Sequence, residues 1–289
     1  MDTLITTVLL THNEEQNLPR CLESLAGLCS EIFVVDSGST DQTAAIAERF
    51  GAHLVSHPFE TAAKQWNWAL QNLPIQSDWV LALDADHRVT PELKEEILRV
   101  IPQAPLEIHG FYIPRKQIFR GRWIRHGGYW PKYLLKLFRR GSVESDERES
   151  LDFRFYVKGQ TRLLRHTLLE QNQKEQEITF WLRKHLHFIE LHAQEEYLRR
   201  HSRVGWAIRP SPWGTPDQQS LWFRTIWYRM PLYVRPFLYF GYRYFLRLGF
   251  LDGAQGTLFH FLQGFWFWLM VDVRLGELNR ARPKESGNR

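Results

Sequence analysis

Apolar runs of strand length alternate with segments of helical periodicity along roughly the first third of this 289-residue chain. Residues 4–10 are apolar and β-branched, as in a strand buried on both faces, and they end abruptly at a polar segment. Similar apolar runs occupy residues 31–35, 53–56 and 79–83. Between these runs, apolar side chains recur at helical spacing, as in residues 62–73. The pattern predicts an α/β fold with a mostly parallel sheet covered by helices on both faces.

Turn and capping residues predict where individual helices begin. Ser39 and Gln42 have the spacing of a capping box that opens a helix through residue 50. Pro91 after Thr90 occupies the favoured first position of another helix.

The pattern changes after residue 110. Short β-like segments at 110–113 and 134–138 are followed by a long polar helix at 175–200. The segment 209–216 is rich in Pro and Gly and is the best candidate for a boundary. We therefore expect a catalytic domain at residues 1–208 and a helical region rich in aromatic residues and Arg at residues 209–289.

Composition narrows the class of protein. Hydrophobic residues make up 44% of the chain and charged residues 24%, which is typical of a folded globular protein. The net charge of +5 favours an anionic partner, which could be nucleic acid, a phospholipid surface or a phosphorylated substrate. Cys21 and Cys29 do not resemble an extracellular disulfide framework, and the N-terminal residues lack the pattern of a signal peptide. These features predict a cytoplasmic location.

Acidic residues follow the carboxyl ends of three predicted strands. In an open parallel sheet these ends line one crevice, which is the usual ligand site. A single Asp at a strand end often only caps a turn, so the joint pattern carries the inference. The clusters are Glu14 with Glu15, Asp36 with Asp41, and Asp84 with Asp86.

The segment Asp84-Ala85-Asp86 directly follows the apolar run 79–83. Two neighbouring carboxylates would repel a diphosphate unless a hard cation bridged them, and Mg²⁺ or Mn²⁺ suits that role. Asp-x-Asp alone is a weak motif that occurs by chance in many proteins.

Three segments together resemble the signatures of family 2 glycosyltransferases, in order and at similar spacing. They are Thr11-His12-Asn13-Glu14-Glu15, the segment from Val34 to Thr43 that contains Asp36-Ser37-Gly38-Ser39-Thr40-Asp41, and Leu83-Asp84-Ala85-Asp86. The likeness is greatest to the bacterial branch that builds lipopolysaccharide core and exopolysaccharide. It implies a GT-A fold, which is a Rossmann-like α/β sheet, and inverting transfer from a nucleotide-diphosphate sugar, with UDP as the usual nucleotide.

The resemblance also implies roles for particular residues. Asp86 would ligate the metal directly, and Asp84 would lie near the ribose and the metal. A helix that approaches the nucleotide in similar enzymes would carry Lys64, Gln65 and Asn67, although an exposed helix with Trp66 and Trp68 partly buried is an equal alternative. The implied nucleotide-sugar contacts are Thr11, Asn13, Glu14, Asp36, Ser37, Gly38, Lys64, Gln65, Asn67, Asp84 and Ala85.

Inverting transfer needs a general base that takes the proton from the acceptor hydroxyl. Related sequences carry an acidic pair after a short aromatic-basic strand, and here Asp146 and Glu147 occupy that place. We expect Glu147 to be the base, with Asp146 as the second candidate and a solvated loop as the alternative. Relatives often place a histidine where Glu170 stands, so a third protein ligand to the metal is in question. His166 is close enough in sequence to replace it.

Two aromatic and basic segments suggest further partners. Residues 115–129 resemble a basic loop over a phosphorylated donor or acceptor, and no nucleic-acid motif accompanies them. Residues 222–275 alternate aromatic residues with Arg, as interfacial membrane helices do, since the rings settle at headgroups and Arg meets lipid phosphate. The alternatives are an ordinary helical cap or a homo-oligomer interface. The run 257–273 is too short and too polar for a confident transmembrane span.

The sequence thus predicts a peripheral membrane enzyme at the inner face of the cytoplasmic membrane, with a glycolipid or polysaccharide acceptor. Two other classes stay open. A sugar nucleotidyltransferase would need a Gly-rich phosphate loop, and residues 10–16 contain no glycine. A membrane-surface scaffold or sugar-nucleotide-binding protein without activity would need a degenerate site, whereas Asp36, Asp84 and Asp86 are intact.

Overall fold

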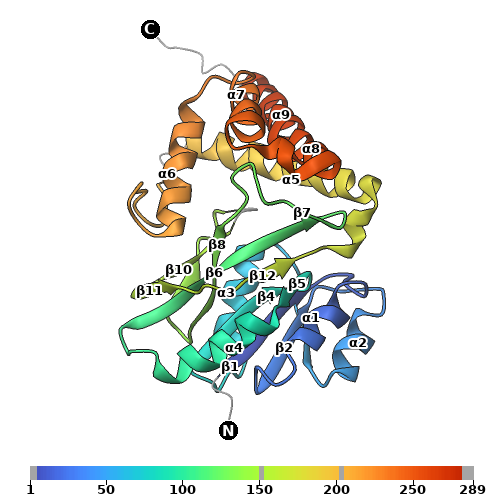
Figure 1. Ribbon diagram of the computed structural model, residues 1–289, viewed down its shortest axis with the longest axis vertical. Helices are drawn as coiled ribbons and strands as arrows, with labels where there is room; N and C mark the ends of the chain where they lie inside the picture. The colour runs from blue at the N-terminus through green and yellow to red at the C-terminus, as the bar shows by residue number, and fades with distance from the viewer. Residues whose placement is uncertain (1–4, 150–152, 202–204, 282–289) are drawn as a thin grey trace. The chain divides into compact units, whose positions relative to one another are not determined.

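The computed structural model describes residues 5–149, 153–201 and 205–281. The chain forms two compact units, Met1–Glu177 and Ile178–Arg289 (Figure 1). The division falls earlier than the expected boundary at residues 208 and 209. It does so because helix α5 (Ile178–His201), which we assigned to the catalytic domain, packs along helix α9 (Phe267–Ala281) of the second unit.

The first unit is built on one mixed sheet in the order β3-β2-β1-β4-β8-β6-β12-β5. Strands β3, β2, β1 and β4 are mutually parallel, and β8 pairs antiparallel with both β4 and β6. The strands of this path are β1 (Ile5–Thr11), β2 (Glu31–Asp36), β3 (His53–Ser56), β4 (Trp79–Asp84), β5 (His87–Val89), β6 (Ile108–Phe119), β8 (Lys132–Arg139) and β12 (Leu168–Glu170). Beside it, β7 (Arg122–Trp123) and β11 (Gln160–Leu163) pair with β6, and β9 (Val143–Ser145) pairs with β10 (Phe155–Val157).

Both faces of the sheet are covered, as the apolar runs predicted. Successive residues of β1 show this: Leu9 joins the core under α1 (Leu18–Ser24) and α4 (Pro91–Val100), and Val8 joins the core under α3 (Ala62–Asn72). Helix α2 (Thr43–Arg49) and the 3-10 turns η1 (Ile101–Gln103) and η2 (Gln173–Gln176) complete the unit.

The N-terminal caps confirm one predicted helix start and correct another. Thr90 accepts a hydrogen bond from the backbone N–H of Leu93 (3.2 Å) at the start of α4. The capping box at Ser39 and Gln42 was wrong, since α2 begins at Thr43 and Gln42 makes no side-chain cap. The Ser39 hydroxyl donates instead to the carboxylate of Asp36 (2.5 Å), because that carboxylate ends a buried strand and lies nearer than the helix.

Strand β6 is much longer than the short segment predicted at residues 110–113. Gly110 and Pro114 resemble strand breaks in the sequence, but both lie within β6. A Cβ at position 110 would lie 2.8 Å from Cδ1 of Leu135, so the glycine permits close approach of β8 rather than a turn.

The second unit is helical. It contains α5, α6 (Pro216–Arg229), α7 (Arg235–Gly241), the π-helical segment η3 (Tyr242–Leu246), the 3-10 turn η4 (Gly249–Asp252), α8 (Gly253–Phe261), the π-helical segment η5 (Leu262–Trp266) and α9. Its apolar core joins Ile189 and Ala193 of α5 to Phe267, Val271 and Leu275. Among the described residues, no helix is long and apolar enough to cross a bilayer.

Two arginines of the second unit correct our expectation that Arg side chains meet lipid phosphate. The Arg235 guanidinium is fully buried, where it donates to Glu196 (2.8 and 2.9 Å) and to Oδ1 of Asp272 (2.8 Å from Nε). Arg243 is also buried, and it donates to Nδ1 of His260 (3.2 Å). Their positive charges therefore balance acidic and polar groups inside the unit.

Candidate active site

The parallel strands bring the three acidic clusters to one edge of the sheet. Thr11 at the end of β1 is the register partner of Asp36 at the end of β2, and Leu10 is the partner of Asp84 at the end of β4. The carboxylates of Asp36 and Asp84 therefore stand at nearly the same level on either side of β1, at the strand ends where a ligand of an open parallel sheet usually binds.

Asp36 is held by a donor from the end of β1 and by a donor from the loop that follows β2. Thr11 Oγ1 donates to Oδ1 (2.9 Å), and the backbone N–H of Ser39 donates to Oδ2 (2.8 Å). The carboxylate is 7% exposed, so these bonds fix the first turn of the loop that follows β2. Gly38 in this turn has φ of 78°, a conformation that glycine adopts without strain.

The loops after β1 and β2 are joined to each other. The backbone N–H of Asn13 donates to the Ser39 hydroxyl (2.7 Å), and the Asn13 side-chain oxygen accepts from the N–H of Thr40 (2.8 Å). The Glu14 carboxylate accepts from Nζ of Lys174 (2.6 Å) and from Nδ2 of Asn17 (2.7 Å). Asn13 and Glu14 therefore shape this edge, and their side chains already have protein partners.

The three candidates on α3 have different surroundings. Gln65 is buried and donates to the Ser37 hydroxyl (2.9 Å), so it supports the loop after β2. Lys64 is exposed and forms an ion pair with Glu60. Asn67 bonds instead to the loop that carries Glu147. Trp66 is fully buried in the core under α3, which leaves it no role in contacting a nucleotide.

A buried lysine accompanies Asp84. Nζ of Lys136, from β8, donates to Oδ2 of Asp84 (2.9 Å), while 40% of the Asp84 side chain is exposed. Burial opposes the charge of this carboxyl group, but the ammonium of Lys136 outweighs it and lowers the pKa of Asp84. The sequence offered one signal for Lys136: a charged residue stands between two apolar ones, and all three of Leu135-Lys136-Leu137 are buried.

His87 links the turn of Asp84 to strand β12. Its Nδ1 accepts from the backbone N–H of Asp84 (3.0 Å), so its Nε2 carries the proton that is donated to Glu170 (3.2 Å). The guanidinium of Arg115 also donates to Glu170 (2.8 Å). Burial alone would raise the pKa of Glu170, but Arg115 and His87 hold it below its ordinary range. Arg115 is thus part of this buried chain and not of a basic loop.

The pair Asp84 and Asp86 has the donor chemistry for Mg²⁺ or Mn²⁺. Ala85 between them is buried in the core, which directs the two flanking side chains away from it. Over the described residues, no group of three or more His, Cys, Asp or Glu side chains could hold a metal. Mg²⁺ bound beside a nucleotide commonly uses one or two carboxylates plus phosphate oxygens and water, so a two-carboxylate site fits this metal.

The two candidates for a third ligand are engaged elsewhere. His166 Nδ1 lies 3.0 Å from Oε2 of Glu96, and the backbone N–H of His166 donates to the same oxygen (2.9 Å). Glu170 is paired with His87 and Arg115. Neither His166 nor Glu170 therefore adds a third metal ligand to Asp84 and Asp86.

The two candidate bases differ in their contacts. Asp146 accepts two hydrogen bonds from the Arg148 guanidinium (2.6 and 2.8 Å), and its side chain is 5% exposed. Glu147 is exposed and accepts from Nδ2 of Asn67 (3.1 Å). Asn67 also bonds both backbone groups of Ser145 (3.0 and 2.9 Å). The amide of Asn67 therefore positions the loop that carries Glu147. The sequence did not predict this role of Asn67.

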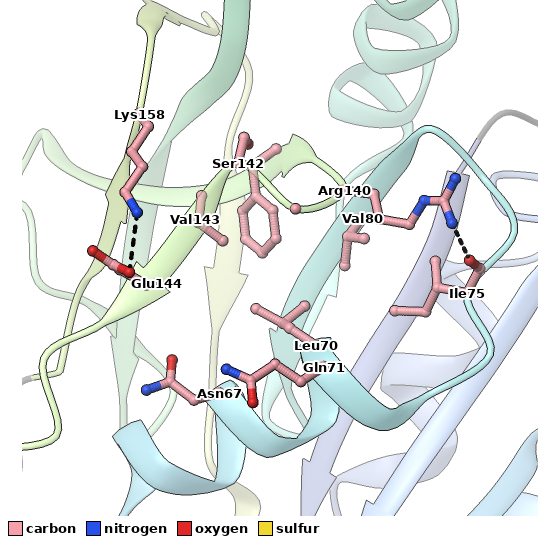
Figure 2. A pocket seen from close by; sticks show the side chains of 12 residues that line it. Asn67, Leu70, Gln71, Ile75, Val80, Arg140, Ser142, Val143, Glu144 and Lys158 are labelled. Carbon is pink, nitrogen blue, oxygen red and sulfur yellow. Dashed lines mark hydrogen bonds and ion pairs between the residues drawn. The ribbon is translucent and has the colours of Figure 1, made fainter.

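A separate cavity of about 210 Å³ lies between α3 and the β8–β9 connection (Figure 2). Val80 and Phe138 line it, and Val80 stands near the start of β4, at the end remote from Asp84. Lys158 and Glu144 form an ion pair (3.2 Å) at its rim. The cavity is therefore distinct from the carboxylate edge, and Asn67 both lines it and contacts the loop that carries Glu147.

The sequence model of glycosyl transferase family 2 matches residues 6–187, which is more than half of the chain. This chain belongs to that family. Its catalytic unit accordingly has the GT-A type of α/β sheet, with Asp84-Ala85-Asp86 at the end of β4.

The relatives of this family 2 member cover only parts of it. An uncharacterized glycosyltransferase of Rickettsia conorii is 40% identical over 93 residues, which is 32% of each chain. The lipopolysaccharide core biosynthesis glycosyltransferase LpsC of Rhizobium meliloti is 32% identical over 152 residues, or 49% of this chain and 53% of LpsC. The chain thus spans between a third and about half of the length of these curated relatives.

Solved structures show a partial likeness. Glucosyl-3-phosphoglycerate synthase from Mycobacterium tuberculosis, in complex with Mn²⁺, UDP and glucosyl-3-phosphoglycerate, is 26% identical, with a TM-score of 0.32. The match covers 40% of this chain and 44% of that one. Because the TM-score and the coverage are low, this likeness does not bear on individual site residues.

Proposed function

We propose that this family 2 glycosyltransferase transfers a sugar, with inversion, from a UDP-sugar to a lipid-linked or lipopolysaccharide-type acceptor at the cytoplasmic face of a membrane. One observation carries the proposal: Asp84 and Asp86 lie at the strand edge that Thr11 and Asp36 share, within the unit that also presents Glu147 on an ordered loop. The relationship to LpsC supports the class of acceptor.

The donor would bind along the ends of β1, β2 and β4. The ordered turn at Asp36 and Ser37 would receive the nucleoside, and the exposed ammonium of Lys64 would add positive charge near it. Asp84 and Asp86 would hold Mg²⁺ or Mn²⁺, which would neutralise the diphosphate as it leaves. Lys136 keeps Asp84 ionised and in place, because its ammonium binds one carboxylate oxygen and leaves the other for the ligand.

Glu147 would take the proton of the acceptor hydroxyl while that oxygen attacks the anomeric carbon from the face opposite the diphosphate. Its exposure suits a group that must meet an acceptor, and the Asn67 bond fixes its position. Asp146 is the weaker candidate, because the guanidinium of Arg148 occupies both of its oxygens.

The proposal is tested by turnover. The purified chain is incubated with Mn²⁺, a panel of UDP-sugars and GDP-sugars, and truncated lipopolysaccharide-core acceptors, and the anomeric configuration of the product is read by NMR. We expect UDP release that depends on acceptor and a product whose anomeric centre is opposite to that of the donor. Retention of configuration would refute the direct displacement. A parallel incubation with UTP and a sugar 1-phosphate that released pyrophosphate and formed a UDP-sugar would instead identify a nucleotidyltransferase.

A further inference from the structure

The second unit contains a helical hairpin, residues 235–261, whose outward side chains are apolar. Its first arm is α7 and η3, its turn includes η4, and its second arm is α8. Cross-arm contacts define it: the Phe240 ring lies 6.3 Å from Phe261, Arg243 bonds His260, and the Tyr244 and Thr257 hydroxyls are 3.0 Å apart. Helices α7, α8 and α9 lie together in Figure 1.

The apolar face follows the first arm and the turn. Exposed side chains recur at residues 237–238, at 242 and at 245–246, which are about one helical turn apart, and they continue through the turn. Leu246 is the most exposed of them, at 76%. We call this set the apolar stripe: Phe237, Leu238, Tyr242, Phe245, Leu246, Leu248, Phe250 and Leu251.

Apart from Arg247, the charged side chains of the hairpin are buried. Arg243 donates to Nδ1 of His260, whose Nε2 therefore donates to Oδ2 of Asp252 (3.2 Å), and all three side chains are buried. In residues 236–271, all of which the structure describes, Arg247 is the one exposed Asp, Glu, Lys or Arg. Water-facing protein surfaces normally carry their charged side chains outside and their apolar side chains inside. Ionisable groups that pair beneath an apolar exterior are typical of protein in contact with lipid.

We propose that the apolar stripe docks in the interface of a phospholipid bilayer that contains anionic lipid, with the hairpin lying along the surface and Arg247 at a headgroup phosphate. The proposal names the membrane contact for the function proposed above and rests on that location. It does not require a span, in keeping with the finding that no described helix is long and apolar enough to cross.

The single exposed charge favours lipid over a second copy of the chain. In a two-fold contact the same stripe faces itself, so the partner's stripe would bring no acidic group to Arg247. An anionic headgroup supplies that negative charge, and its acyl chains accept the aromatic and aliphatic side chains. The buried bonds of Arg243, His260 and Asp252 keep the two arms together while the stripe is in lipid.

The test is flotation of the 289-residue chain with phosphatidylcholine vesicles that contain or lack phosphatidylglycerol. The variant Phe245→Ser/Leu246→Ser changes the stripe. Its matched control is Phe59→Ser/Leu106→Ser, which changes the same residue types at similarly exposed positions of the first unit (58% and 84%). We expect the stripe variant to lose vesicle binding about tenfold and the control to bind as the wild type does. Arg247→Gln should lose only the preference for phosphatidylglycerol, about fivefold.

Calorimetric titration with UDP and Mn²⁺ on the same samples separates this inference from the proposed enzyme activity. Loss of flotation with UDP binding retained supports docking by the stripe. Flotation unchanged in the stripe variant, or lost equally in the control, would refute it. A wild-type chain that ignores vesicles and forms a dimer that the stripe variant abolishes would show that the stripe is a protein interface. Absence of UDP binding in a chain that still floats would overturn only the proposed function.

Discussion

The two units place ionisable side chains in opposite ways. In the first unit, apolar side chains fill both faces of the sheet, and Asp84 and Asp86 stand at the end of β4, where a ligand can reach them. In the second unit, Arg235 is buried with Glu196 and Asp272, while Phe245 and Leu246 are exposed. The Asp84 carboxylate is 40% exposed although it pairs with Lys136, whereas Arg235 and Asp272 pair with each other fully inside the second unit. Removing a charge should therefore affect function in the first unit and stability in the second.

The largest effect should come from Glu147→Gln, which removes the proposed base and keeps the side chain's shape. We expect kcat to fall about 10³-fold with unchanged UDP binding and unchanged unfolding, because the side chain is exposed. The control is Glu144→Gln, an exposed glutamate of β9 that pairs with Lys158. Rates from UDP release check this, and a Glu147→Gln enzyme with wild-type kcat would exclude Glu147 as the base.

Arg235→Met should show the opposite behaviour in the second unit. It leaves two carboxylates buried without their shared cation, which costs about 3–5 kcal/mol of unfolding free energy. Arg274→Met is the matched control, because the Arg274 side chain is 37% exposed where it pairs with Glu190, so its loss should cost much less. Urea unfolding followed by circular dichroism measures both, and equal losses would contradict the contrast between the units.

Acid should destabilise the second unit through His185. Burial lowers the pKa of this imidazole from about 6.5 to about 4, so the folded state keeps it neutral while the unfolded chain takes up a proton. The neutral His185 side chain therefore adds up to about 3 kcal/mol to the free energy of unfolding above pH 6.5. This contribution is lost as pH falls toward 4. His185→Gln should weaken the dependence of the thermal unfolding temperature on pH between 6.5 and 4. His187→Gln, at an exposed position, should leave that dependence unchanged.

Asn67→Ala should produce the smallest effect and separates two roles. If Asn67 positions the Glu147 loop, kcat falls about tenfold and UDP affinity is unchanged. Asn72→Ala is the control on the same helix, since that side chain bonds only to the Trp68 carbonyl among the contacts shown. A weakened UDP affinity with unchanged kcat would restore the nucleotide contact implied by family resemblance.

The fold of the first unit could be predicted because it depends on local patterns. Apolar runs that end in Asp36 and Asp84 locate strands whose carboxyl ends must meet in a parallel sheet. The family resemblance then supplied the candidate residues, of which Thr11, Asp36 and Asp84 lie at the ends of neighbouring strands.

The partners of those residues were not predictable, because they come from distant parts of the chain. Lys136 meets Asp84 across 52 residues, Asn67 meets Ser145 across 78, and Arg235 meets Glu196 across 39. Alternation of aromatic residues with Arg in the tail likewise cannot tell an arginine that faces lipid from one that is buried in an ion pair. Only the packing of α5 against α9 decides it.

The most direct test of the account is calorimetric titration of UDP and GDP, each with and without Mn²⁺, into the wild type, Asp86→Ala and Asp78→Ala. Asp78 is exposed and precedes β4, so its variant removes a carboxylate at the opposite end of the same strand from Asp84 and Asp86. We expect UDP binding that requires Mn²⁺, is lost in Asp86→Ala and is retained in Asp78→Ala. Binding that ignores Mn²⁺, or that survives Asp86→Ala, would contradict a metal and nucleotide site at the end of β4.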